Sequence, residues 1–268
     1  MSRLLASLAI ALALSACAAR TPPRPAGPAG PDPGAVDAFT RATAACRGFR
    51  SMTGELSLSG RAAGERIRGR VIAGLETGGS VRLEGVAPFG PPVFILAGTA
   101  EKATLLLPRE RRVLKETAVA AVLERLTGLA LGADDLRLMV SGCLADNAAP
   151  ADGKQWPGGW QAVSLGADRV AYIRLVQGQP TVVAADYGPW HVDYSEHLSG
   201  YPRLVRVRRA GGAASDSAAA TDITARVGEL EVNTTINPLA FALEIPADAD
   251  PMTLDELRSV APLVPKEP

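Results

Sequence analysis

The chain has 268 residues, of which 47% are hydrophobic and 21% charged, so it is long enough for one large domain or two small ones. Its 28 basic and 28 acidic residues balance to a formal net charge of zero, which argues against nucleic-acid binding and against electrostatic attraction of a charged substrate. Aromatic residues make up only 4%, whereas there are 27 glycines and 21 prolines, a composition typical of many short strands joined by turns.

The N-terminus has the features of an export signal. Arg3 supplies a positive charge, and Leu4–Leu14 is an apolar run shorter than the roughly 20 residues that span a bilayer. Small residues then lead to Cys17, the pattern at which bacterial lipoproteins are cleaved and acylated. We therefore predict a signal peptide over 1–16 and lipid attachment at Cys17, with an ordinary signal peptide and an incidental cysteine as the alternative. The next residue is Ala18 rather than Asp, which by analogy with Gram-negative lipoprotein sorting does not signal inner-membrane retention.

A proline-rich segment follows the cysteine. Residues 18–34 contain six prolines among small residues, so we predict that 17–34 is a lipidated, polyproline-like tether reaching as much as ~50 Å. Asp32 and Pro33 resemble a helix start, with an N-cap followed by proline at the first helical position. The predicted helix ends near Arg47. Its apolar stripe is Val36, Phe39, Ala42 and Cys46.

Two series of short alternating segments predict β-strands. Close spacing and a period of two are typical of antiparallel strands with one buried face. The first series comprises Met52–Ser59, Glu65–Glu76, Val81–Val86, Val93–Gly98, Ala103–Leu107 and Arg111–Leu114. The second comprises Trp160–Leu165, Arg169–Val176, Pro180–Tyr187, Trp190–Glu196, Arg203–Arg209 and Ile223–Ile236. In the last of these the apolar phase shifts around Gly228, which predicts a bulge in a curved sheet.

The segment between the two series changes to a helical period. Thr117 is its candidate N-cap and Gly128 its stop. A second helix is predicted over Asp134–Ser141, with two aspartates at its positive end and Gly142 after it. The first helix has apolar residues at i, i+3, i+4 and i+7, namely Val119, Val122, Leu123 and Leu126.

About eleven strands with two helices inserted midway predict an α+β, mainly β fold. We expect a half-open, curved antiparallel barrel over 35–236, with the helices as a lid over its open face. Residues 237–268 form a C-terminal tail with a weak helical pattern around Thr253–Val260. A curved aliphatic sheet with a lid could enclose a cavity suited to acyl chains, and an ordinary filled core is the alternative that periodicity leaves open.

Two further cysteines, Cys46 and Cys143, remain in the mature chain. In an oxidising periplasm they could form one disulfide, and two buried free thiols are the alternative. Sequence alone does not decide between them, because pairing requires a short distance between the two Cα atoms.

Few residues suit catalysis. Strand alternation places both histidines, His191 and His197, with Asp193 on one face, which we interpret as solvent-facing. At about 3.3 Å per residue the two imidazoles would be roughly 20 Å apart, too far to share a metal unless the chain turns. The sequence shows no local nucleophile motif and no glycine-rich phosphate loop before a helix. We therefore predict no enzymatic activity, no metal and no cofactor.

Two of the predicted strands each carry several arginines on one face. Arg66, Arg68 and Arg70 share one face, and Arg206 and Arg208 share another. The simplest interpretation is a row of solvent-facing charges. Docking of an acidic carrier protein is the alternative.

The order of elements and two segments resemble the outer-membrane lipoprotein receptor family LolB and, more loosely, its periplasmic partner LolA. Val81–Gly98 (VRLEGVAPFGPPVFILAG) is similar to the LolB strands that flank a Pro-apolar-Gly tip. Ala118–Gly142 (AVAAVLERLTGLALGADDLRLMVSG) is similar to the LolB helix pair. The later strands match in pattern only, so the resemblance covers most of Gly34–Ile236 with few identities.

The resemblance implies a half-open barrel with a helical lid and a cavity for the acyl chains of lipoproteins. It implies that cargo arrives from a soluble LolA-type periplasmic carrier and enters the outer membrane without ATP. Phe89, within Pro88-Phe89-Gly90, occupies the position of the protruding apolar residue that assists insertion in LolB.

The same loop can be interpreted from its residues alone. Pro88, Gly90, Pro91 and Pro92 stiffen the turn, so Phe89 would lose little entropy on being held in place. A phenylalanine kept in water forgoes roughly 2–3 kcal/mol of burial, part of which a membrane interface would recover. The alternative is that Phe89 folds back into a hydrophobic turn.

The tether and tail are longer than LolB needs, and the tail from Asn237 through Pro246 is similar to LolA-type carriers instead. We predict an outer-membrane lipoprotein, anchored by its N-terminal lipid and facing the periplasm as a monomer. It would bind the acyl chains of lipid-modified proteins and help insert them, with no nucleic-acid partner. A tethered carrier of another lipid or glycolipid, and a purely structural lipoprotein, are the alternatives.

Overall fold

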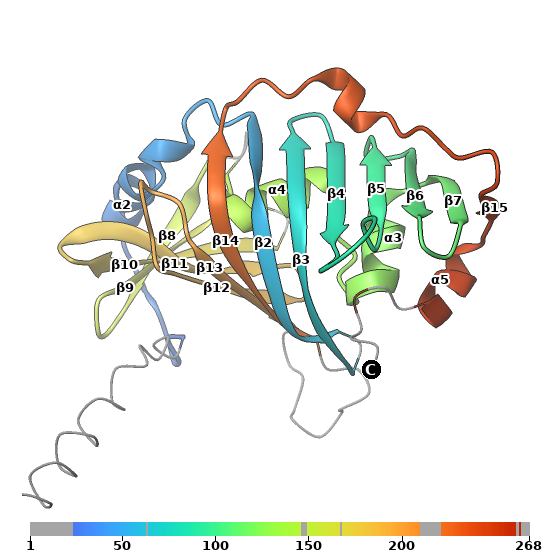
Figure 1. The fold of residues 1–268 in the computed structure, drawn as a ribbon. Coiled ribbons are helices and arrows are strands. Elements are labelled where there is room, and N and C mark those ends of the chain that lie inside the picture. Colours follow the sequence, from blue (N-terminus) through green and yellow to red (C-terminus); the bar gives the residue numbers. More distant parts are fainter. Residues whose placement is uncertain are drawn as a thin grey trace, which may run out of the picture.

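The described strands form one curved, open antiparallel sheet with four helices. A computed structural model of the chain (Figure 1) describes residues 24–62, 64–145, 149–166, 168–209, 221–260 and 263. The predicted signal peptide and Cys17 lie outside these residues. The sheet has 15 strands, and every pairing except the last is antiparallel.

Two meanders make up the sheet. The first comprises β2 (Ser51–Ala62), β3 (Glu65–Glu76), β4 (Ser80–Val86), β5 (Ile95–Gly98), β6 (Ala103–Leu107) and β7 (Arg112–Thr117). The second comprises β8 (Ala151–Trp156), β9 (Trp160–Ser164), β10 (Arg169–Val176), β11 (Gln179–Tyr187), β12 (Trp190–Ser195), β13 (Leu204–Arg209) and β14 (Asp222–Val232). Because β14 pairs with β2, the two meanders join into a single curved surface.

The sheet has more strands than the expected eleven, because the strands at and next to its two edges were not predicted from the sequence. β8 reads Ala-Asp-Gly-Lys-Gln-Trp and is largely exposed, so it has no apolar alternation. The two outermost strands, β1 (Gly30–Pro31) and β15 (Asp250–Pro251), have only two residues each. The sheet stays open between these edges, so the expected half-open barrel is a wider, unclosed sheet. The bulge predicted at Gly228 is confirmed by a register shift between β14 and β2 at that point.

The two helices expected as a lid lie between β7 and β8 in the chain and behind β2–β5 in Figure 1. They are α3 (Val119–Thr127) and α4 (Ala133–Ser141). Gly128 and Gly142 cap them in the left-handed conformation, with φ of 75° and 74°, as predicted. The expected Thr117 N-cap was wrong: Ala118 is the N-cap of α3, and Thr117 is the last residue of β7.

The first described helix, α2 (Gly34–Ala42), begins one residue later than expected. Pro33 is its N-cap, and Asp32 Oδ1 accepts a hydrogen bond from the Gly34 N–H at 2.9 Å. The helix ends at Ala42, and a 3₁₀ turn, η2 (Ala44–Cys46), carries the chain almost to the expected end. The helix packs on the β8–β11 part of the sheet.

The C-terminal segment wraps the first meander and is part of the body. After β14 it passes over the ends of β2–β6 (Figure 1), where the Ala240 carbonyl accepts a hydrogen bond from Arg82 at 2.8 Å. Ala240 belongs to η3 (Pro238–Phe241), which is followed by β15 beside β7 and α5 (Leu254–Val260) packed on α3. Thr253 and Glu256 form a reciprocal capping box at the start of α5. Leu257 is fully buried, so the weak helical pattern corresponds to a packed helix.

Candidate functional site

The concave face of the sheet is covered by its own helices. Val119 and Val122 of the predicted lid are fully buried and Leu123 nearly so, while Leu126 is partly buried against the same cluster. Leu138 and Met139 of α4 join them in contact with the aliphatic inner face of the sheet. Side chains therefore occupy the space expected for a ligand. Two hollows among the described residues lie at the rims of the sheet instead.

One rim carries the loop between β4 and β5. Phe89 is 89% exposed, the largest exposed fraction of any big hydrophobic side chain in the described part of the chain. Its carbonyl oxygen accepts a hydrogen bond of 2.6 Å from the Arg109 guanidinium, which ties the loop to the β6–β7 turn. Gly90 has φ of +78°, a left-handed conformation that favours glycine. The Pro88-Phe89-Gly90 loop thus holds its aromatic ring out in solvent.

The base of this loop is fixed by close packing. The Gly85 N–H donates to the Phe94 carbonyl at 2.9 Å, and the Gly85 carbonyl accepts from the Val93 N–H at 2.8 Å. A Cβ on Gly85 would lie 2.6 Å from the Phe94 ring, so only glycine fits there. Phe94 is 2% exposed. The loop therefore protrudes from a rigid, well-packed stem.

A groove of about 910 Å³ lies beside the loop. Pro88, Val86 and Val93 line one side of it, and the charged side chains Arg68 and Arg109 also reach it. Leu263 of the C-terminal segment lines the groove as well, and its carbonyl accepts a hydrogen bond from the Arg68 N–H at 3.3 Å. The groove thus combines apolar walls with a basic border.

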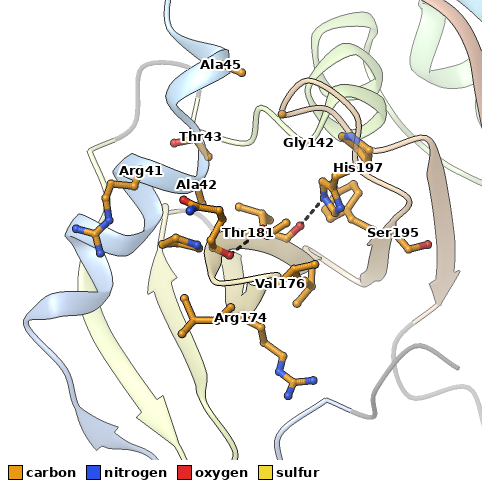
Figure 2. A pocket seen from close by; sticks show the side chains of 18 of the residues that line it. Arg41, Ala42, Thr43, Ala45, Gly142, Arg174, Val176, Thr181, Ser195 and His197 are labelled. Carbon is orange, nitrogen blue, oxygen red and sulfur yellow. Dashed lines mark hydrogen bonds between the residues drawn. The ribbon is translucent and has the colours of Figure 1, made fainter. Parts of the chain in front are cut away.

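The opposite rim holds a second hollow of about 960 Å³ between α2–η2 and the β10–β11 hairpin. Figure 2 shows His197 and Thr181 near its centre, with Arg41 and Arg174 towards its outside. His197 Nε2 lies 3.0 Å from the Val182 carbonyl oxygen. His197 is thus partly buried and not solvent-facing as expected, because β12 ends at Ser195 and strand alternation no longer applies beyond it.

We expect His197 to make the fold acid-sensitive. Burial lowers the pKa of its imidazole below the usual 6.5, opposed by the hydrogen bond to Val182. As pH falls through 6.5 the unfolded chain takes up the proton first, so the free energy of unfolding decreases, by at most about 1.4 kcal/mol per pH unit. Thermal melts of His197→Gln and the parent between pH 5 and 7.5 measure this. The parent should lose more stability on acidification, and parallel curves would contradict the assignment.

A polar cluster lies on the outer face of β10–β12. Arg24 pairs with Asp186, donates to the carbonyl oxygens of Ala185 and Val192, and lies over the Tyr172 ring. His191 Nδ1 is 2.6 Å from the same Asp186 carboxylate. Burial, followed by the hydrogen bond to Asp186, raises the pKa of Tyr172 to about 12. From Arg24 onward the predicted tether is therefore bound to the body.

The cluster corrects the expected solvent-facing position of Asp193. Its carboxylate is only 6% exposed and accepts a 2.5 Å hydrogen bond from Arg208. Arg24 also lies 3.7 Å away. Alternation placed Asp193 on the correct face, but the N-terminal segment that covers this face could not be foreseen from the strand alone.

Cys46 and Cys143 form a disulfide with a Cα–Cα distance of 5.4 Å. It connects η2 to the residue after the C-cap of α4, and so attaches the end of the lid to the α2 side of the molecule. Arg137 on α4 is 1% exposed, pairs with Asp134 at 3.1 Å, and lies over the Phe49 ring. Sequence reasoning missed this buried arginine, because a charged side chain on an amphipathic helix usually faces solvent.

Within the described ranges, no cluster of three or more His, Cys, Asp or Glu side chains could hold a metal ion. Among the same residues, no helix combines the length and the hydropathy needed to cross a bilayer.

No protein-family model and no curated protein matches the chain. Solved structures do show a likeness. A DUF1329 family protein from Desulfovibrio piger is 13% identical with a TM-score of 0.46, covering 79% of this chain and 97% of its own. A Vibrio parahaemolyticus domain named for outer membrane lipoprotein sorting is 9% identical with a TM-score of 0.41, covering 77% and 95%. The Mycobacterium tuberculosis lipoprotein LppX is 10% identical with a TM-score of 0.32, covering 77% and 98%.

Proposed function

We propose that this chain is a membrane-anchored lipoprotein that binds the acyl chains of lipid-modified proteins and helps insert them into the outer membrane. The observation that carries the proposal is Phe89, 89% exposed on a loop braced by Arg109. A rigid, solvent-held aromatic tip has an unfavourable hydration that contact with the acyl region of a membrane would relieve. The role is one of binding and transfer, without catalysis.

The acyl-binding part of the proposal rests on the concave face. Its sheet and helix residues are apolar and mostly aliphatic, with aromatic side chains such as Trp190 and Tyr194 among them. α3 packs against α5, with an exposed ion pair between Arg125 and Asp255 at 2.6 Å. Displacing α3 and α4 from the sheet would replace aliphatic contacts by contacts with an acyl chain of similar polarity. In this proposal the lid helices lie closed on the sheet, and cargo binding moves them.

We expect the mature chain (residues 17–268, with Cys17→Ser to remove the anchor) to bind one triacylated lipopeptide. Native mass spectrometry measures this directly, and a free fatty acid should compete. Val122→Asp places a carboxylate on the buried face of the lid and should prevent binding; because it also destabilises the core, its loss of binding counts only where circular dichroism shows a folded chain.

A second candidate is a purely structural lipoprotein, which the filled core favours. It predicts a well-folded chain that stays empty at every lipopeptide concentration. A complex with a glycolipid but not with the lipopeptide would instead support a tethered carrier of another lipid. The same mass spectra therefore separate the three functions.

A further inference from the structure

The β2–β3 hairpin carries a row of arginines on the outer face of the sheet. In the ladder between the two strands, Arg61 lies directly opposite Arg66, while Arg68 and Arg70 lie opposite Ser59 and Ser57. All four arginines are exposed. Their spacing of two places them on one face of a single hairpin, and Arg68 and Arg70 line the same groove as Pro88 of the Phe89 loop.

Three of these arginines have no carboxylate partner among the described residues. Arg70 pairs with Glu55 at 3.4 Å, and the Arg61 guanidinium donates to the Gly64 carbonyl at 3.0 Å. Arg66 and Arg68 show no ion pair in the described part of the chain. Because like charges directly opposite each other destabilise an antiparallel pair, the Arg61–Arg66 pair lowers the stability of the hairpin. On its other side Arg61 lies opposite Asp222 of β14, but that carboxylate already pairs with Arg206 at 2.5 Å.

The basic face is continuous with the aromatic tip. Arg68 and Arg109 line the same groove of about 910 Å³ as Pro88, and Arg109 holds the Phe89 carbonyl oxygen. Glu110 also reaches this groove, and Arg226 in it is neutralised by Glu196. Free positive charge thus adjoins the point at which a large apolar side chain leaves the protein.

We propose that Arg61, Arg66, Arg68 and Arg109 form a site for the phosphate groups of anionic phospholipids, with Phe89 inserted among the acyl chains below them. This inference rests on the proposed function and names the surface that positions the body on the bilayer. A bilayer fits better than an acidic protein because the exposed ring lies beside the arginines: guanidinium groups bind phosphate at the headgroup level, and an apolar ring enters the layer beneath.

Vesicle co-sedimentation of the mature chain with Cys17→Ser tests the site. One set of vesicles is phosphatidylcholine alone, and the other contains 30% phosphatidylglycerol. Each arginine near an anionic surface is worth about a fivefold change in partition, so we expect Arg66→Gln/Arg68→Gln to bind the anionic vesicles about 25-fold more weakly than the parent. The parent's preference for anionic vesicles should disappear in 1 M salt.

Arg41→Gln/Arg47→Gln is the matched control. It removes the same charge from exposed arginines on α2 and after η2, and should bind anionic vesicles like the parent. Melting of Arg66→Gln separates function from folding, because relief of the Arg61–Arg66 repulsion should raise Tm by about 1–2 °C.

Equal binding of the parent to both vesicle types overturns the phosphate site, and leaves an acidic protein as the occupant of the hairpin face. Equal losses in the two double variants also overturn it, because the effect is then one of net charge. Neither result bears on the complex with the lipopeptide. Absence of that complex in native mass spectrometry would refute acyl binding itself. The failure of the phosphate site and the failure of the proposed function are thus distinguishable.

Discussion

Replacing Phe89 by glutamate should leave the fold intact and reduce delivery of an acylated cargo to vesicles at least tenfold. The side chain is 89% exposed, and surface changes of this kind usually alter the free energy of unfolding by about 0.5 kcal/mol or less. A carboxylate loses the roughly 2–3 kcal/mol that burial of the ring would contribute at the membrane. The measurement is transfer of a bound triacylated lipopeptide to floated vesicles, with cargo loading checked separately.

Phe89→Leu is the matched control for this experiment. It keeps an apolar side chain on the same braced loop, so delivery should fall no more than a few-fold. Normal delivery by Phe89→Glu would refute the insertion role of the tip. Loss of cargo loading in that variant, with delivery per loaded molecule unchanged, would place Phe89 in cargo binding instead.

Much of the sheet could be predicted because its strands have one buried and one exposed face. In β3, Ile67, Val71, Ala73 and Leu75 share one face and are buried, whereas the arginines and Ile72 between them lie on the exposed face. Gly128 and Gly142 likewise predicted the ends of α3 and α4, since glycine is favoured in the left-handed cap. These signals are local, so one sequence is sufficient to detect them.

The parts that sequence reasoning missed depend on contacts between distant segments. The burial of Asp193 requires Arg24, and the wrap of the C-terminal segment depends on the pairing of β15 with β7. Neither leaves a periodic pattern. The filled core could not be predicted from the sequence either, because a strand face has the same aliphatic pattern whether a lid helix or an acyl chain covers it.

Removing the disulfide should strongly destabilise the chain. The two cysteines are 97 residues apart, and in the chain-entropy model closing a loop of about this length contributes roughly 4.7 kcal/mol, with about 2–5 kcal/mol usual for loss of a native bridge. For a domain of this size Tm should fall by about 5–15 °C. Differential scanning calorimetry of Cys46→Ser/Cys143→Ser against the oxidised parent measures the loss.

The parent treated with a reductant is the control that separates the bridge from the two substitutions, and its Tm should fall to nearly that of the double variant. A decrease of less than 2 °C in both would show that the 97-residue loop is already restrained by the packing of α4 on the sheet. Because the bridge fixes the residue after the α4 C-cap to η2, its loss should also loosen the lid. Faster hydrogen exchange confined to Ala133–Ser141 would show that the disulfide holds the closed form, whereas uniformly faster exchange would mean that it acts on global stability alone.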